Sequence, residues 1–64
     1  MQITLLPQRR LIELEGRRSV GDVLKTLGLL PGTVMVIRGD QLVTEQEMVE
    51  ADDALEIRNV ISGG

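Results

Sequence analysis

Apolar and polar residues alternate in three short segments of the chain, at positions 2–6, 10–15 and 54–60. A period of two is typical of β-strands that bury one face. The connection between the first two segments is short and contains Pro7, which cannot donate a ladder hydrogen bond, so we expect these two segments to pair as a hairpin. The residues expected to face the core are Ile3, Leu5, Ile12, Leu14, Leu55 and Ile57.

The pattern changes to a helical period between residues 19 and 28. One apolar stripe is formed by Val20, Val23, Leu24 and Leu27. This spacing of three and four predicts a helix over residues 20–27. Ser19 precedes the stripe, and its hydroxyl can accept a hydrogen bond from the amide of Asp22, as an N-cap does. Gly28 follows the stripe and favours the end of the helix there.

Residues 33–38 are apolar at nearly every position, which is typical of a central strand that is covered on both faces. Gly39-Asp40 predicts a turn, and a short strand follows at 41–43. The next segment, 44–53, is polar and acidic. Within it, Met48 and Val49 are expected to anchor the loop to the core.

The predicted order is strand, strand, helix, strand, short strand, strand, which indicates an α+β fold of the β-grasp type. We expect a mixed sheet of four to five strands around one helix. By the crossover rule, strand 33–38 should run parallel to a neighbouring central strand, and the last strand should lie parallel beside the first. Residues 1–60 are expected to form one domain, followed by a flexible C-terminal tail at 61–64.

Composition excludes several classes of function. The chain has 64 residues, no cysteine, no histidine, no aromatic residue and a formal net charge of −3. A catalytic triad, a thiolate metal site and base stacking on aromatic rings are therefore excluded, and a polyanionic partner is disfavoured. We expect no catalytic residue, no bound cofactor, no metal, no direct nucleic-acid contact and no membrane segment, in a cytoplasmic protein.

Gly63 and Gly64 end the sequence. Without a Cβ, two glycines can pass through an opening that would exclude any side chain. We expect the α-carboxylate of Gly64 to be a free group that a partner can activate. A carboxylate is ionised at neutral pH and resists nucleophiles, so activation requires an ATP-using enzyme. The alternative is that the two glycines are simply a frayed terminus.

The parity of strand 33–38 gives a second candidate site. If Met35 and Ile37 face the helix, the opposite face of the sheet carries the other residues of that strand. The predicted partner-docking patch consists of Val34, Val36 and Val60, rimmed by Arg58. Two alternatives stay open: valine is a good strand former in any case, and a slip of one residue would exchange the two faces.

Three stretches of the sequence resemble the ubiquitin-like sulfur-carrier family, the ThiS and MoaD group. They are the closing Val60-Ile-Ser-Gly-Gly64, the helix of residues 19–27, and segment 34–42. The short chain and its Ile-Ser-Gly-Gly ending are most similar to the bacterial carrier used for 2-thiolation of tRNA uridine, with archaeal small modifiers close behind. The resemblance covers essentially the whole chain.

This resemblance implies that an E1-like enzyme uses ATP to adenylate the Gly64 carboxylate. A persulfide from a sulfurtransferase then displaces AMP and leaves a C-terminal thiocarboxylate. A downstream sulfur-accepting enzyme would take the sulfur for tRNA thiolation, thiamin synthesis or molybdopterin synthesis. In this scheme ATP belongs to the partner, and the chain itself is not an enzyme.

Two other functions are compatible with the same residues. A ubiquitin-like modifier would be joined through Gly64 to lysines of target proteins, either instead of carrying sulfur or in addition to it. Lys25 is the only lysine, so it is the candidate acceptor for self-conjugation. The residues before the glycines lack the arginines of ubiquitin's tail, which argues against a eukaryotic-type cascade. A non-covalent β-grasp binding module is the second alternative.

Overall fold

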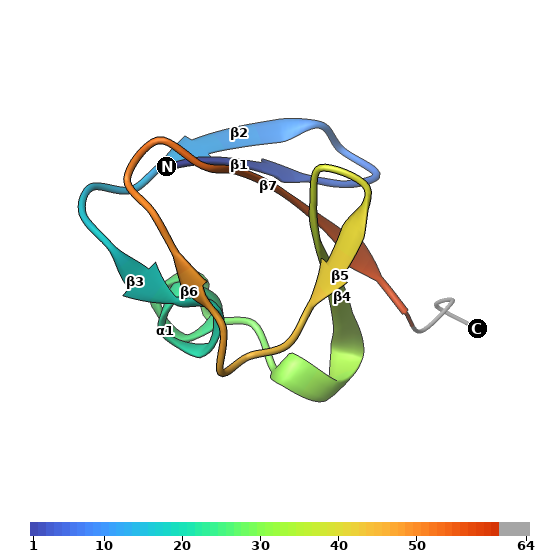
Figure 1. Ribbon diagram of the computed structural model, residues 1–64. Coiled ribbons are helices and arrows are strands. Elements are labelled where there is room, and N and C mark those ends of the chain that lie inside the picture. The colour runs from blue at the N-terminus through green and yellow to red at the C-terminus, as the bar shows by residue number, and fades with distance from the viewer. Residues whose placement is uncertain (61–64) are drawn as a thin grey trace.

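The structure is a computed structural model, which describes residues 1–60 of the chain. A mixed five-stranded sheet, in the order β2-β1-β7-β4-β5, packs against one helix (Figure 1). The elements are β1 (Gln2–Leu5), β2 (Arg10–Glu13), β3 (Arg18–Ser19), α1 (Val20–Leu27), the 3₁₀ turn η1 (Pro31–Thr33), β4 (Val34–Arg38), β5 (Gln41–Val43), β6 (Met48–Val49) and β7 (Ala54–Asn59). The predicted α+β fold of the β-grasp type is confirmed.

The last strand is central in the sheet, as predicted. β7 runs parallel to β1, with Ile3 opposite Leu55, and antiparallel to β4, with Val36 opposite Ile57. β1 and β2 form the expected hairpin, in which Ile3 lies opposite Ile12. Because β7 has a neighbour on both sides, its backbone is held along its whole length.

The predicted direction of the third long strand was wrong. β4 runs antiparallel to both of its neighbours, β7 and β5. The crossover through α1 does join two strands of the same sense, because β2 and β4 run the same way. However, β1 and β7 lie between them in the sheet. The crossover rule was therefore applied to the wrong pair of strands.

The N-terminus of α1 is capped by the predicted Ser19 bond and by two further bonds that the sequence did not indicate. The Asp22 amide donates to Ser19 Oγ at 3.1 Å, and the amides of Val20 and Gly21 donate to carbonyls of the 44–47 loop, each at 2.8 Å. A Cβ at Gly21 would lie 3.2 Å from the Glu45 carbonyl oxygen, so glycine permits this close approach. At the other end, Gly28 has φ 74°, the left-handed conformation of a helix C-cap.

A second, two-stranded sheet was not predicted. β3 pairs with β6, placing Arg18 opposite Val49 and Ser19 opposite Met48. Val49 is fully buried, as expected of an anchor, but Met48 is 39% exposed, so its predicted role as an anchor was wrong. The reason is the alternation of a strand, which turns adjacent side chains to opposite faces.

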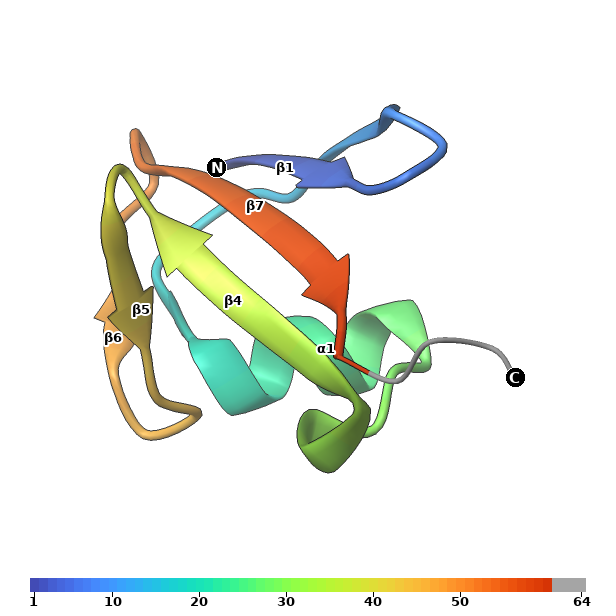
Figure 2. The same cartoon turned by 90° about the vertical axis from the view of Figure 1, so that its right-hand side faces the viewer.

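The core is entirely aliphatic and lies between the sheet and α1, which covers one face of the sheet (Figure 2). The buried residues are Met1, Ile3, Val20, Val23, Leu24, Val34, Val36, Val49, Leu55 and Ile57. Within residues 1–60, no helix has the length and apolarity needed to cross a membrane.

Candidate functional site

The candidate site begins where β7 ends. Asn59 pairs with Val34 of β4, and the Val60 amide donates to the Thr33 carbonyl at 3.0 Å. The chain is therefore held by backbone hydrogen bonds up to Val60, the last residue that the structure describes. Gly63 and Gly64 lie outside the described residues, and their role stays a prediction.

The predicted face of Val34 and Val36 was wrong. Val34 is 9% exposed and Val36 is 4% exposed, and both belong to the core. Val36 lies opposite Ile57, another core residue, because β4 and β7 pair in a register that brings their buried faces together. This is the one-residue slip that exchanges the two faces of a strand.

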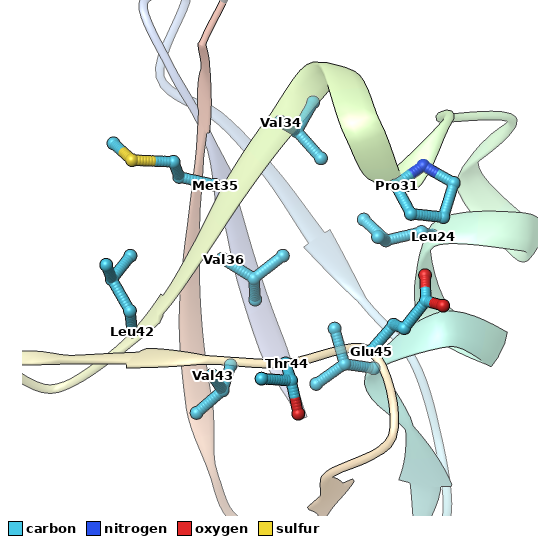
Figure 3. Close-up of a pocket in the computed structure, with 10 residues that line it drawn as sticks. Leu24, Pro31, Val34, Met35, Val36, Leu42, Val43, Thr44 and Glu45 are labelled. Carbon is cyan, nitrogen blue, oxygen red and sulfur yellow. The ribbon is translucent and has the colours of Figure 1, made fainter.

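The face of the sheet that points away from α1 carries the alternate residues instead. Met35 lies opposite Arg58, and Ile37 lies opposite both Glu56 and Leu42. Figure 3 shows Met35 and Leu42 on one side of β4, with Val34 and Val36 on the other side, toward Leu24. We call the apolar residues that the strand alternation places here the outer face: Leu11, Met35, Ile37, Leu42 and Val60.

The outer face is accessible over much of its area. Leu42 is 66% exposed, Leu11 63% and Val60 53%, with Met35 less exposed at 37%. Exposed apolar side chains that gather on one face of a small protein often mark an interaction surface. Of the four residues of the predicted patch, Arg58 and Val60 lie on this side of the sheet and Val34 and Val36 belong to the core, while the docking role of the patch stays a prediction.

One ion pair crosses the outer face. Arg58 Nε donates to Glu56 Oε2 at 2.8 Å, with side chains 54% and 38% exposed. An exposed pair of this kind contributes little to stability. Its charges therefore remain able to exchange partners when another surface approaches.

Lys25 lies on α1, away from the outer face, and is exposed. The other amine of the described chain is differently placed. The Met1 ammonium donates to the Leu14 carbonyl at 2.6 Å, and Met1 is only 7% exposed. Lys25 is thus the accessible amine of residues 1–60, while its use as an acceptor stays a prediction.

Within residues 1–60, no group of three or more metal-ligating side chains comes together. The groove between α1, β4 and β5 has a volume of about 240 Å³ and is lined mainly by aliphatic side chains, with Glu45 as the charged one (Figure 3). This volume is below the range of typical small-molecule pockets.

Comparison with known proteins decides the family. The chain is 43% identical, over 65 aligned residues, to the sulfur carrier protein TtuB of Thermus thermophilus, and the match covers 100% of both chains. The chain belongs to the sulfur carrier protein family. No family model matches it. The resemblance to ubiquitin-like sulfur carriers is thereby confirmed, and a sulfur carrier bears the reacting group without being the catalyst, as predicted.

For this sulfur carrier, the sequence pattern missed Leu11, Met35, Ile37 and Leu42 as residues of the outer face. The sequence contained part of the information needed to predict these residues. The two-residue turn at Gly39-Asp40 fixes Ile37 opposite Leu42 and Val36 opposite Val43. These pairings tell which residues share a face, but not which face is buried.

Proposed function

We propose that this carrier bears sulfur on the α-carboxylate of Gly64 and delivers it for the thiolation of tRNA uridine. The observation that carries the proposal is the 43% identity to a sulfur carrier along the full length of both chains. The position of β7 supports it, because a central strand leads directly toward residues 61–64. The short chain and its Ile-Ser-Gly-Gly ending are similar to the bacterial carrier used for tRNA thiolation, and we place these steps in the cytoplasm.

The first step is activation of the carboxylate by an E1-like enzyme. A carboxylate oxygen of Gly64 attacks the α-phosphorus of ATP, and pyrophosphate leaves, so that the product is an acyl adenylate. This step converts an ionised group that resists nucleophiles into an electrophilic carbonyl.

The second step introduces sulfur. The terminal sulfur of a persulfide attacks the carbonyl carbon, AMP leaves, and an acyl disulfide forms. A thiol of the sulfurtransferase system then attacks that disulfide and is itself oxidised to a disulfide, which releases the C-terminal thiocarboxylate. A downstream enzyme would pass this sulfur to its acceptor.

We propose that the outer face docks on the activating enzyme during these steps. Val60 belongs to this face and precedes Gly64 by four residues, which span at most about 14 Å when extended. An enzyme that holds the Gly64 carboxylate must therefore lie close to the Val60 end of the outer face. Burial of the exposed apolar side chains of this face would stabilise the complex through the hydrophobic effect.

The proposal is tested by intact mass spectrometry. The purified carrier is incubated with ATP, the adenylating enzyme of its host and a persulfide donor, with parallel reactions that lack ATP or use a variant without Gly64. We expect one oxygen to be replaced by one sulfur in the complete reaction alone. An unchanged mass with an adenylating enzyme that is active on another carrier would refute the proposal.

The acceptor is tested in the host. We expect deletion of the gene to remove 2-thiouridine from tRNA while growth without thiamin or molybdopterin supplements continues. Normal 2-thiouridine together with auxotrophy would assign the carrier to another pathway.

A modifier role would use the same activated carboxylate, with a lysine amine in place of the persulfide. The specific observation that bears on it is that Lys25 is exposed, whereas the α-amine of Met1 is hydrogen-bonded to the Leu14 carbonyl. We expect any self-conjugate to show a glycylglycine remnant on Lys25 after digestion and to disappear in Lys25→Arg. Remnants on host proteins would establish modification of targets, and their absence would leave sulfur transfer as the role of the activated end.

A further inference from the structure

Charged side chains are unevenly distributed between the two ends of the five-stranded sheet. Glu13, Asp52 and Asp53 border one shallow cleft near the start of β7. Asp40 lies at the same end of the sheet, in the turn that follows β4. Four acidic residues, Glu13, Asp40, Asp52 and Asp53, therefore lie at the end of the sheet opposite to Val60, whereas Glu45, which follows β5, lies toward the Val34 end.

The end of the sheet near Val60 carries two further arginines. Arg17, Arg18, Arg38 and Arg58 each pair with a carboxylate. Within residues 1–60, Arg9 and Arg10 form no such pair, and both are exposed. Arg9 ends the connection between β1 and β2, Arg10 is the first residue of β2, and we refer to the two as the arginine turn.

The backbone of Arg9 adds a second observation. Its φ is 60°, in the left-handed region that glycine and asparagine adopt most readily. A long side chain at such a position carries a conformational cost, and costs of this kind concentrate at functional sites. An arginine here suggests that its side chain has a use beyond forming the turn.

The connection that leads to the arginine turn starts beside the last residues of β7. The Leu6 amide donates to the Ile57 carbonyl at 2.9 Å. Gln8 and Asn59 line one cleft of about 250 Å³. Figures 1 and 2 both show the β1–β2 connection on the same side of the molecule as the end of β7. A partner that engages Gly64 would therefore meet Arg9 and Arg10.

We propose that the arginine turn is an electrostatic docking element for a carboxylate-rich surface of the activating enzyme, and that it turns the Val60 end of the carrier toward that enzyme. The inference rests on the proposed function. Carboxylates bind arginine through charge-assisted, often bidentate hydrogen bonds. Asp40, Asp52 and Asp53 lie at one end of the sheet and the arginine turn lies at the other. An acidic partner would therefore orient the carrier before contact.

An acidic protein surface fits these observations better than RNA does. The chain has a formal net charge of −3, which repels a polyanion at long range. Two adjacent arginines supply few phosphate contacts, whereas they suffice for a local pair with one or two carboxylates.

The test compares two charge reversals that alter the net charge equally. Arg10→Glu changes the arginine turn, and Arg17→Glu changes an exposed arginine in the connection between β2 and β3. The readout is ATP–pyrophosphate exchange by the host's adenylating enzyme, measured at several salt concentrations. We expect Arg10→Glu to raise KM roughly three- to tenfold at low salt, with the difference shrinking at high salt. Arg17→Glu should leave KM within about twofold of wild type.

Arg9→Gly separates docking from folding. Glycine suits a φ of 60°, so we expect the variant to melt no lower than wild type and yet to show a raised, less salt-sensitive KM. A lower melting temperature with unchanged KM would show that Arg9 serves the turn only, and would overturn its place in the proposal.

Different results would contradict the proposed function and the docking element. Absence of exchange with the wild-type carrier contradicts the proposed function. If the wild-type carrier supports exchange, and Arg10→Glu and Arg17→Glu support it equally well, only the docking element is contradicted. Unchanged exchange combined with loss of tRNA binding in Arg10→Glu, measured by fluorescence anisotropy with labelled tRNA, would assign the turn to RNA instead.

Discussion

Val36 and Met35 are neighbours in β4, but an introduced charge would meet opposite environments at the two positions. Val36 is 4% exposed, faces the core and lies opposite Ile57. Met35 is 37% exposed and lies opposite Arg58 on the outer face. A carboxylate at the first position would be buried without a partner, while one at the second could pair with an arginine in water.

We expect Val36→Asp to lower the free energy of unfolding by more than about 3 kcal/mol, which is a large part of the stability of a chain this short. Met35→Asp should change it by less than about 1 kcal/mol. Urea unfolding followed by far-ultraviolet circular dichroism measures both, since the chain has no aromatic fluorophore. Similar midpoints for the two variants would contradict the assigned faces.

Among the strands, the face that each residue takes could be predicted only where polar residues mark the solvent side. In β1, Gln2 and Thr4 alternate with Ile3 and Leu5, and the inward residues were predicted correctly, as they were in β7. The β4 sequence Val-Met-Val-Ile is apolar at each of its first four positions, so it does not show which of these residues face the core. Pairing with β7 determines which residues of β4 face the core, and pairing is a long-range property that a local pattern does not contain. Arg58 and Val60 of the candidate site were therefore placed correctly, whereas Val34 and Val36 were not.

The helix was predictable to the residue, because each of its determinants is local. A stripe at spacing three and four, a serine before it and a glycine after it lie within one short segment. The β3–β6 pair shows the opposite case, since strands of two residues are too short to display a period.

The cap of α1 gives a prediction at the scale of the element. Ser19→Ala removes the acceptor of the Asp22 amide, and we expect a loss of about 1 kcal/mol, or a melting temperature lower by roughly 4–8 °C. Thr26→Ala is the matched control in the exposed part of the same helix. It should leave stability unchanged or slightly raised, since alanine favours a helix more than threonine does. Equal losses in the two variants would show that the Ser19 hydrogen bond has no special weight.

As a whole, the molecule assigns different tasks to the two faces of its sheet. Its aliphatic core lies on the α1 face, while the other face keeps several apolar side chains exposed although a chain of 64 residues has few to spare. Burying them within the same chain would require a second layer that the described residues do not form. Exposure of this kind is explained most simply by a partner that covers the outer face.

Two methionines of nearly equal exposure allow this explanation to be tested. Met35 is 37% exposed on the outer face, and Met48 is 39% exposed on β6, in the separate two-stranded sheet. We expect Met35→Asp to raise the KM for activation at least tenfold, because it places a carboxylate in an apolar interface, while Met48→Asp should change KM by less than about twofold. Both variants should remain folded, as judged by circular dichroism. The measurement is again ATP–pyrophosphate exchange with the host's adenylating enzyme. If the two variants raised KM equally, the outer face would not be the docking surface, whereas a loss confined to Met35→Asp would locate the activating enzyme on the same face as Val60.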